Sequence, residues 1–202
     1  ANLLALPDAE KRYDFSSVRL CISAGEGLPT DILRRFEERF HVPILDGIGC
    51  TEMLQTFISN SSDDIRPGSS GKPIPGYEAR IVDEQGQDVP VGAMGSLLVR
   101  GDSAATSYWN KHEKSKEVFR GQWVATGDKY YQDEDGYYWY CGCSDDMLQV
   151  GGQWVSPVAV ENTLIAHPAV LEADGGGAVQ AGRQPGDGQG VPVVALAAVP
   201  GP

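Results

Sequence analysis

Thr51 and Glu52 stand side by side in the stretch ILDGIGCTEM, after an apolar run that contains two glycines. A hydroxyl and a carboxylate at this place suit two different roles. They can end a strand and cap a short helix, or they can contact the phosphates and the metal ion of a nucleotide, because Mg²⁺ prefers hard oxygen ligands. Gly47 and Gly49 would let the backbone approach such a ligand closely. The two residues alone leave both roles open.

Asp128 is the second candidate and ends the stretch WVATGD. A carboxylate at the end of a strand can accept hydrogen bonds from both hydroxyls of a ribose, which is a two-point contact that holds the sugar. Asp is also common at the first position of a turn, so a purely structural role is the alternative.

The elements that must position these residues have the pattern of an α/β protein. VRLCISAGEGLP and VPILDGIG indicate two buried strands, and TDILRRFEERF between them indicates an amphipathic helix with Thr30 as its N-cap. The apolar side chains of this helix share one face: Ile32, Leu33, Phe36 and Phe40. Ligands of α/β sheets gather at the carboxyl ends of the strands, which is where Thr51 and Glu52 lie.

From about residue 59 the pattern changes to short strand candidates separated by turns. The strands are YEARIVD, GSLLVRG, QWVATGD and GYYWYCG, with turns at 83–86 and 133–136, and they predict a small barrel or a hairpin stack. VAVENTLIAHP then predicts a short helix with Pro157 at its start. From Asp174 onward Gly, Ala, Pro and Gln dominate without a helical or strand period until VPVVALAAV, so no regular element is predicted there.

The composition restricts the class of protein. The chain has 202 residues, of which 41% are apolar and 22% charged, as in ordinary globular proteins. A net charge of −12 opposes binding to nucleic acids, although backbone amides and a metal ion can still bind a nucleotide locally. The apolar run 193–199 is too short to cross a bilayer, so no membrane association is expected. The four cysteines lack C-x-x-C spacing, and reduced thiols in a cytoplasmic protein are expected.

Four stretches, in this order and with this spacing, carry a resemblance to a known family: GIGCTE, SSGKPIPGYEARIVDEQG, WVATGD and GCSDDMLQVGGQWVSPVAVE. Together they resemble the adenylate-forming acyl-CoA synthetase superfamily. SAGEGLP, LDGIG with TEML, and YWN with HEKSKEVF are similar to its benzoate-type aryl-CoA ligases. The resemblance covers about residues 18–172. It implies a reaction in which a carboxylate attacks the α-phosphate of ATP to form an acyl-AMP, after which the thiol of CoA displaces AMP.

The same resemblance implies the fold class, α/β and β-barrel. The chain would form the C-terminal part of the large domain of an adenylate-forming enzyme plus an incomplete small α+β domain. The expected segments are the α/β end of the large domain (1–58), its distorted barrel (59–142), a hinge (143–146), the start of the small domain (147–173) and an aberrant or disordered tail (174–202). The chain is therefore expected to be a C-terminal fragment of a ligase, and the full-length protein a candidate homodimer.

The resemblance also implies roles for individual residues. Thr51 and Glu52 are assigned to catalysis, with Glu52 as the Mg²⁺ ligand, and Asp145 is assigned to the hinge. The residues expected to contact ATP or CoA form a larger set: Gly25, Glu26, Gly27, Asp46, Gly47, Ile48, Gly49, Thr51, Asp128, Gly151 and Gly152. Plain turns before the helix at Thr30 and before QWVSP explain the glycines at 25–27 and 151–152 as well, so both interpretations of these two loops stay open.

An aromatic carboxylic acid is the expected substrate. The resemblance places its pocket around the nucleotide glycines and just after the Thr-Glu pair: Ala24, Gly47, Ile48, Met53, Leu54 and Gln55. Apolar residues beside a motif are more often core than pocket, which is the alternative for each of them. Many benzoate ligases have His where this chain has Gln55, and a neutral amide can hydrogen-bond a ring substituent. Benzoate and hydroxybenzoate are therefore both candidate substrates.

The chain also departs from the family pattern. Cys143 stands where the motif has Arg, and Gln149 where related ligases often carry Lys, so weaker nucleotide binding is expected. The family's phosphate loop and its C-terminal lysine have no counterpart in the chain, and the isolated chain is expected to be inactive in adenylation. Two alternatives stay open: a degenerate nucleotide-binding fragment without catalysis, and an adenylation domain that loads a carrier protein instead of CoA.

Overall fold

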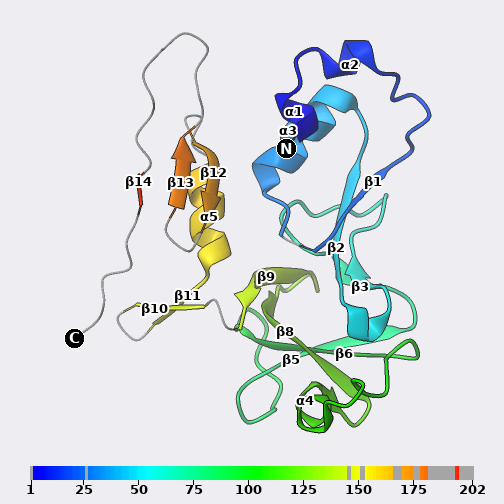
Figure 1. Cartoon of the computed structure of the whole chain (residues 1–202), viewed down its shortest axis with the longest axis vertical. Helices are drawn as coiled ribbons and strands as arrows, with labels where there is room; N and C mark the ends of the chain where they lie inside the picture. The colour runs from blue at the N-terminus through cyan, green and yellow to red at the C-terminus, as the bar shows by residue number, and fades with distance from the viewer. Residues whose placement is uncertain are drawn as a thin grey trace. The chain divides into compact units, whose positions relative to one another are not determined.

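The structure is a computed structural model that describes residues 2–25, 27–144, 147–150, 153–165, 170–174, 178–181 and 194–195. The chain forms two compact units, which divide between Ser144 and Asp145 (Figure 1). This division falls inside 143–146, the segment predicted as a hinge, but the swing of one unit against the other stays a prediction.

Unit 1, residues 1–144, combines short helices with two mixed or antiparallel sheets. The helices are α1 (Asn2–Ala5), α2 (Ala9–Arg12), α3 (Thr30–Phe40), the single 3-10 turn η1 (Thr51–Met53) and α4 (His112–Val118). The strands are β1 (Cys21–Ser23), β2 (Ile44–Gly49), β3 (Thr56–Ser59), β4 (Lys72–Pro73), β5 (Tyr77–Val82), β6 (Gly95–Gly101), β7 (Phe119–Arg120), β8 (Trp123–Gln132) and β9 (Tyr138–Cys143).

Helix α3 spans the residues that its apolar period predicts. Leu33 and Phe40 are buried on one face, and on the opposite face Arg34 forms ion pairs at 2.8 and 3.3 Å with carboxylates one turn away in each direction. The prediction of Thr30 as N-cap is wrong. The N-cap is Pro29, in an extended conformation with ψ 130°, so Thr30 is already the first helical residue.

The first sheet has the strand order β1-β2-β3-β4. β1 and β2 are parallel, with Ser23 opposite Asp46, whereas β2 and β3 are antiparallel, with Gly47 opposite Ser59. Strand β2 therefore changes its pairing partner between Asp46 and Gly47. The sheet is also continuous through β3, across the boundary predicted between residues 58 and 59.

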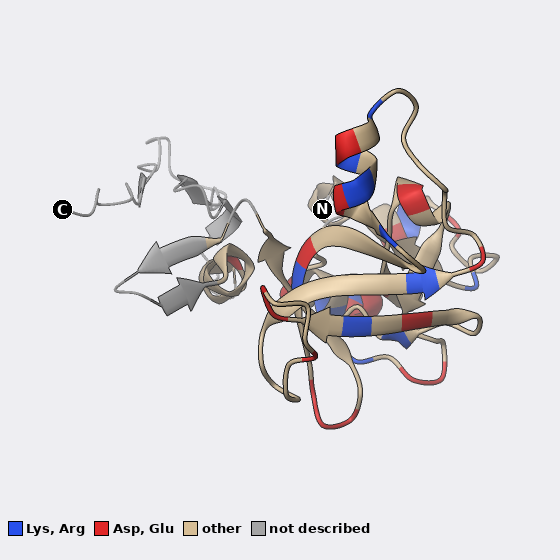
Figure 2. Cartoon of the chain, turned by 90° about the horizontal axis from the view of Figure 1, so that it is seen from below, with Lys and Arg blue, Asp and Glu red and all other residues tan. Residues whose placement is uncertain are grey.

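The second sheet is antiparallel and has the order β5-β6-β8-β7, with β9 paired to β8. Its outer face carries charged side chains, which Figure 2 shows interspersed along the strands, whereas β6 buries Leu97, Leu98 and Val99 in succession. Cross-strand pairs such as Arg100 with Glu78 lie on this outer face. The core beneath is formed by Met53, Phe57, Ile58, Ile81, Leu97, Val99, Val124, Tyr130 and Tyr138.

Both predicted turns of this sheet are confirmed. The amide of Gly86 donates to the carbonyl oxygen of Asp83 at 3.1 Å, and the amide of Gly136 donates to that of Asp133 at 3.0 Å. Each glycine has a positive φ, 78° and 84°, a conformation that residues with a Cβ rarely adopt. The turn residues were therefore sufficient to place the strand ends.

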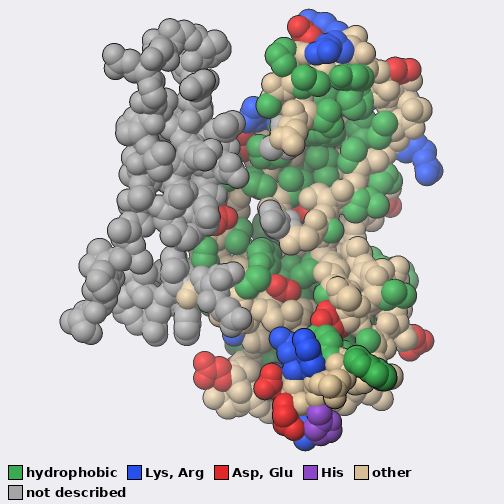
Figure 3. All heavy atoms as spheres, in the orientation of Figure 1, with side chains coloured by type: hydrophobic (Ala, Val, Ile, Leu, Met, Phe, Trp, Pro, Cys, Tyr) green, Lys and Arg blue, Asp and Glu red, His purple; other side chains and the backbone are tan. Residues whose placement is uncertain are grey.

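Hydrophobic side chains are also exposed on unit 1, where Figure 3 shows them gathered over the region of α1–α3 and β1. Strand β1 is at the edge of its sheet, and Ile22 in its middle is 73% exposed. Behind it, Ala9, Phe40 and Val42 form a separate small core.

Unit 2, residues 145–202, contains β10 (Leu148–Val150), β11 (Gln153–Val155), α5 (Pro157–Ile165), β12 (Val170–Asp174), β13 (Ala178–Ala181) and β14 (Val194–Ala195). Helix α5 begins at Pro157 as predicted, and the hydroxyl of Ser156 accepts a hydrogen bond from the amide of Ala159 at 3.2 Å. Within the part of the chain that the structure describes, no helix has both the length and the apolar character needed to cross a membrane.

Strands β13 and β14 lie in the segment 174–202, for which no regular element was predicted, so that expectation is corrected for these residues. They form an antiparallel sheet with β12, with Ala178 opposite both Asp174 and Ala195. Short strands of this kind are defined by backbone pairing, which leaves no periodic pattern in the side chains.

Candidate functional site

The candidate site begins at the point where β2 changes partner. Beyond Ser23 the chain leaves β1, while β2 continues past Asp46 to Gly49 and then enters the turn η1. The predicted residues Asp46, Gly47, Ile48, Gly49, Thr51 and Glu52 therefore lie on one continuous segment, and Ala24 and Gly25 follow the neighbouring strand end. Gly25 has φ 99° and its missing side chain would point into open space.

Asp46 is a buried carboxylate with an unusual environment. Its side chain is 5% exposed, and Oδ1 makes no hydrogen bond with the residues that the structure describes. Burial raises the pKa of this carboxyl to about 6, because the charged form loses its water, and the nearby Ser23 hydroxyl opposes the shift only in part. Its backbone carbonyl is held by Asn60, whose Nδ2 donates to it at 2.9 Å.

Gly47 and Gly49 have a structural reason to be glycine. A Cβ on Gly47 would lie 2.6 Å from the carbonyl oxygen of Ile58, and one on Gly49 would lie 2.8 Å from the backbone of Thr56. The close packing of β2 on β3 thus explains both glycines. The sequence-based reason, close approach to a nucleotide, is not needed to account for them.

The turn η1 places its residues in different environments. Thr51 is exposed, Glu52 is half-buried, and Met53 is fully buried in the core of the second sheet. Leu54, which follows the turn, has φ 70° and is 80% exposed. Met53 thus packs in the core, the alternative to a pocket role, while Leu54 stays at the surface beside Glu52.

Glu52 is held by the segment before α4. The hydroxyl of Tyr108 donates a hydrogen bond to its Oε1, and the amide of Ala105 donates to its carbonyl oxygen at 2.7 Å. The Tyr108 hydrogen bond is the main cause that lowers the pKa of Glu52, and the more distant Lys114 lowers it further. Burial and the neighbouring carboxylate raise the pKa of Tyr108 to about 12, so this hydroxyl remains a donor at neutral pH.

Tyr108 was not among the predicted site residues. It lies 56 positions from Glu52 in the sequence, and only folding brings the two together. The signal that was available is the stretch YWN, which was used for the family resemblance but not for a site.

Asp128 lies on β8 directly opposite Cys143 of β9. The Sγ of Cys143 donates a long, weak hydrogen bond to Asp128 Oδ1 at 3.9 Å, and Tyr140 Oη lies 3.3 Å from the same sulfur. Burial raises the pKa of Asp128, and the weak thiol donor offsets this only partly. Cys143, predicted as the first hinge residue, is therefore the last residue of a strand and the side-chain neighbour of the predicted ribose ligand.

Asp46 and Asp128 belong to the same neighbourhood. Both negative charges act on the buried Tyr130, whose pKa is raised first by its burial and further by these carboxylates. The hydroxyl of Tyr130 lies 2.9 Å from Ser70 Oγ, also buried. The first sheet and the second sheet therefore bring these two predicted nucleotide contacts to one region of unit 1.

Gln55 joins a chain of hydrogen bonds at the end of η1. Its Nε2 donates to the hydroxyl of Tyr77 at 2.8 Å, and that hydroxyl lies 2.7 Å from Ser103 Oγ. Ser103 in turn donates to the carbonyl oxygen of Met53 at 2.6 Å. The amide of Gln55, predicted to face a substrate ring, thus has a partner within the protein.

Four predicted site residues cannot be placed in this geometry. Glu26 of the first loop, Asp145 of the hinge, and Gly151 with Gly152 lie outside the described residues. The flanking strands β10 and β11 are antiparallel, with Val150 opposite Gln153. Gly27 is exposed in the loop before α3.

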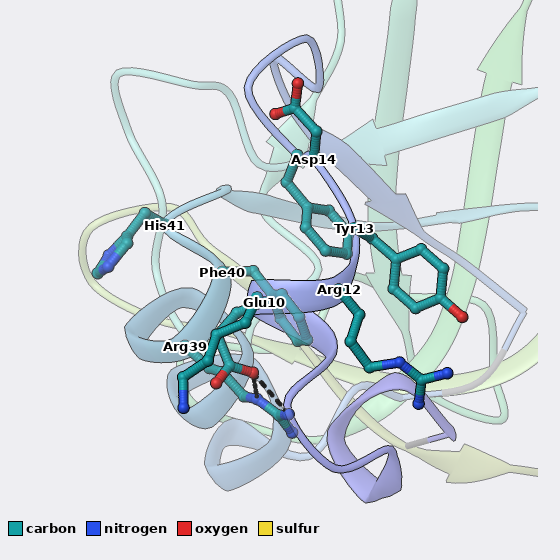
Figure 4. A pocket seen from close by; sticks show the side chains of 9 residues that line it. Glu10, Arg12, Tyr13, Asp14, Arg39, Phe40 and His41 are labelled. Atoms are coloured by element: carbon teal, nitrogen blue, oxygen red, sulfur yellow. Dashed lines mark hydrogen bonds and ion pairs between the residues drawn. The ribbon is translucent and has the colours of Figure 1, made fainter.

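A pocket elsewhere in unit 1 contains none of the predicted residues. It lies between α2 and the end of α3, and Figure 4 shows Arg39 and Glu10 joined across it. Arg39 donates to Glu10 and, at 2.7 Å each, to the carbonyl oxygens of Leu4 and Leu6. Its guanidinium is thus occupied in attaching the N-terminal helices to α3, which is a structural role.

Residues 1–109 match the sequence profile of the family described as AMP-binding enzyme. The chain belongs to this family. The AMP-binding enzyme match includes β2, η1 and Tyr108, so the strand change at Asp46 and the turn with Glu52 both lie within it.

Relatives of this AMP-binding chain include aryl-CoA ligases. It is 52% identical to the benzoate–CoA ligase of Thauera aromatica over 86% of the chain and 33% of the relative. It is 43% identical to the 4-hydroxybenzoate–CoA/benzoate–CoA ligase of Rhodopseudomonas palustris over 86% of the chain and 32% of the relative. The chain thus spans about a third of the length of these relatives.

Solved structures show the same fold. An anthranilate CoA ligase in complex with anthranoyl-AMP has a TM-score of 0.81 and 58% identity, over 84% of this chain and 33% of that one. A benzoate CoA ligase from Burkholderia xenovorans has a TM-score of 0.79 and 45% identity, over 92% of this chain and 36% of that one. The mixed sheets of this AMP-binding chain therefore have the fold of adenylate-forming enzymes, as the sequence predicted.

Proposed function

We propose that the chain is the C-terminal part of an ATP-dependent, AMP-forming ligase that converts an aromatic carboxylic acid to its CoA thioester. The observation that carries this proposal is Glu52, a carboxylate held ionised at the carboxyl end of β2, within the part of the chain that matches the AMP-binding family. Relatives that act on benzoate, hydroxybenzoate and anthranilate support an aromatic substrate.

The reaction has two steps, and the first brings two anions together, the aromatic carboxylate and the triphosphate of ATP. An oxygen of the aromatic carboxylate attacks the α-phosphorus of ATP, and pyrophosphate leaves to give the acyl-AMP. The sulfur of CoA then attacks the acyl carbon, AMP leaves with the oxygen, and the thiol proton goes to solvent. A site for this chemistry must hold the sugar and the phosphates of the nucleotide in place.

The described residues divide these tasks in our proposal. Asp128 accepts hydrogen bonds from the ribose hydroxyls, and Asp46 with the loop at Gly25 lies on the side of the base. The hydroxyl of Thr51 is exposed and donates to a phosphate oxygen. The wall for the aromatic ring combines exposed residues that follow β1 and η1 with two half-buried residues inside β2: Ala24, Leu54 and Gln55, and Gly47 and Ile48.

Glu52 fits a magnesium ion. Its carboxylate is a hard oxygen donor, and among the described residues no group of three or more His, Cys, Asp or Glu side chains forms a closed metal cage. Mg²⁺ binds through one or two carboxylates together with substrate phosphates and keeps several waters, which suits a single carboxylate on an open turn. When bound, the ion neutralises charge on the phosphates.

The assignments in unit 2 follow from the family alone. We propose Asp145 as the hinge residue and Gly151 with Gly152 as part of the path for CoA. The CoA step distinguishes this function from the loading of a carrier protein. Thioester formed with free CoA, and not only with a carrier, supports the ligase.

AMP binding by the chain tests the nucleotide site directly. Asp128→Ala removes the ribose acceptor and is expected to weaken AMP binding about 10- to 100-fold, because hydrogen bonds to a charged group are among the stronger ones. Asp88→Ala, which removes a carboxylate paired with Arg80 on the outer face, is the matched control and should bind AMP normally. Asp128 lies inside β8 and neither at its end nor in a turn, as the sequence had suggested, so isothermal titration of both variants decides between the ribose role and a purely structural role in the strand.

The activity itself is tested on a longer protein that contains this chain. Benzoate, 4-hydroxybenzoate or anthranilate should promote exchange of pyrophosphate into ATP, and Glu52→Gln should reduce the exchange. Absence of exchange with a panel of aromatic and aliphatic acids would contradict the proposed function, even if AMP still binds.

A further inference from the structure

The turn that carries Glu52 accepts hydrogen bonds from one segment, residues 103–108. Ser103 Oγ donates to the carbonyl oxygen of Met53 at 2.6 Å, and the amide of Ala105 donates to that of Glu52 at 2.7 Å. The third contact, from the hydroxyl of Tyr108 to Oε1 of Glu52, is made to the side chain. Two contacts therefore hold the backbone of the turn, and Tyr108 is the main hydrogen-bond donor to its carboxylate, with the Cys50 thiol as a weaker one.

Tyr108 is itself fixed by contacts to Ser115 and Phe119. Its amide donates to the hydroxyl of Ser115 at 2.9 Å, and that hydroxyl donates to the carbonyl oxygen of Lys111 at 2.7 Å. Its ring packs on Phe119 with a centroid separation of 5.3 Å. Ser115 is buried on α4, so the phenol ring is fixed by a buried hydrogen bond and an aromatic contact rather than by Glu52 alone.

Without Tyr108, the carboxylate would lose its strongest hydrogen bond and keep weaker ones, such as that of the Cys50 thiol. Thr51 and Leu54 on either side are exposed, and Glu52 is only half-buried, so little packing restricts its side-chain torsions. A group bonded to the side chain of a metal ligand orients that ligand and strengthens metal binding. A hydroxyl that occupies Oε1 leaves the carboxylate in one orientation relative to η1.

We infer that Tyr108 is a positioning residue for Glu52, which orients the carboxylate toward the cation of a bound metal–nucleotide complex. The inference rests on the proposed function, because it needs Glu52 to be a metal ligand. Tyr108 would contact neither the nucleotide nor the ion. Its hydroxyl acts through Glu52 alone, so its effect should appear in metal-dependent binding and not in binding of AMP without metal.

Tyr108→Phe removes the hydroxyl and keeps the ring on Phe119. The matched control is Tyr137→Phe, because Tyr137 donates an equivalent hydrogen bond to a carboxylate, Asp64, that is not part of the candidate site. The probe is Mn²⁺ with ATP, and the readout is the enhancement of water-proton relaxation when the chain immobilises the ion. AMP binding without metal and the thermal unfolding midpoint are measured on the same samples.

We expect Tyr108→Phe to weaken the binding of Mn²⁺–ATP about tenfold, while AMP binding and the unfolding midpoint change no more than in Tyr137→Phe. An equal loss of AMP binding, or an equal loss of Mn²⁺–ATP binding in the control, would make Tyr108 a general structural residue and overturn the inference. Glu52→Gln distinguishes a failure of the inference about Tyr108 from a failure of the proposed metal site. If it abolishes the enhancement and Tyr108→Phe does not, the inference fails and the proposed function stands. If the unaltered chain and Glu52→Gln behave alike, Glu52 is no metal ligand, and the proposed site fails together with the inference.

Discussion

The two ends of the candidate site hold their carboxylates in opposite ways. On η1, Tyr108 donates to Glu52 and lowers its pKa, so the folded chain stabilises the anion. At the strand change, burial raises the pKa of Asp46 to about 6, and its Oδ1 has no hydrogen-bond partner among the described residues. The comparison shows that the chain preorganises the anion of Glu52, whereas burial outweighs the hydrogen bonds to Asp46 and leaves its Oδ1 without a partner among the described residues.

The two ends also respond to pH with opposite signs. A carboxyl whose pKa is lowered by folding, such as Glu52, adds stability above its unfolded pKa, and this is lost as the pH falls. A carboxyl whose pKa is raised, such as Asp46, adds stability below its unfolded pKa, and this is lost as the pH rises toward 6. At neutral pH the ionised form of Glu52 therefore adds to the stability of the fold, whereas the ionised form of Asp46 reduces it.

The largest expected effect comes from removing the anchor of the Glu52 turn. Met53→Ala leaves a cavity in the core of the second sheet and should lower the free energy of unfolding by about 3 kcal/mol, since Met53 is fully buried. Leu54→Ala, at the exposed neighbouring position, should change it by less than about 0.5 kcal/mol. Urea unfolding of both variants gives the comparison, and similar values for the two would mean that the turn is not anchored through Met53.

A smaller effect is expected at the other end. Asp46→Asn removes the buried charge, so between pH 4.5 and pH 8 the stability of the variant relative to the unaltered chain should rise by about 2 kcal/mol. The sign follows from the raised pKa, because the unaltered chain must bury an anion at pH 8 and a neutral acid at pH 4.5. Urea unfolding at the two pH values measures the difference. A stability difference that is independent of pH would show that Asp46 is not strained by its burial.

The smallest expected effect is at the pair of Asp128 and Cys143. Cys143→Arg replaces a weak thiol donor with a guanidinium, which should lower the pKa of Asp128 and raise the affinity for AMP about fivefold. Because Cys143 is exposed, the stability of the fold should hardly change. Cys143→Ser is the control, since it keeps a short donor without the charge. Equal AMP affinities for the Arg and Ser variants would remove the argument that a cation is missing from this place.

Local patterns predicted the regular elements well and the contacts between them poorly. The apolar period of α3 and the Asp–Gly turns at Gly86 and Gly136 are local signals, because a helix face and a tight turn depend on residues a few positions apart. The predicted N-cap of α3 was wrong by one residue, because Pro29 has the extended conformation that was expected of Thr30. The strands β13 and β14 were missed since their pairing leaves no period in the side chains.

The candidate site shows the same division. Thr51, Glu52 and Asp128 were predicted from motifs, and the structure places Glu52 and Asp128 in environments that shift their pKa values. Met53 was predicted as a possible pocket residue and is in the core instead. The nucleotide contact predicted for Gly47 and Gly49 stays a prediction, because the packing of β2 on β3 already explains both glycines.

The sequence by itself determined the family, because four motifs in register specify it without any knowledge of distances, and it determined most helices and strands, because their patterns are local. Only the tertiary structure decided how the carboxylates are held. Tyr108 reaches Glu52 across 56 positions, and Cys143 meets Asp128 through the register of β8 and β9. Such contacts depend on how distant segments pack, and burial, hydrogen bonding and hence charge state follow from that packing and not from the residue types alone.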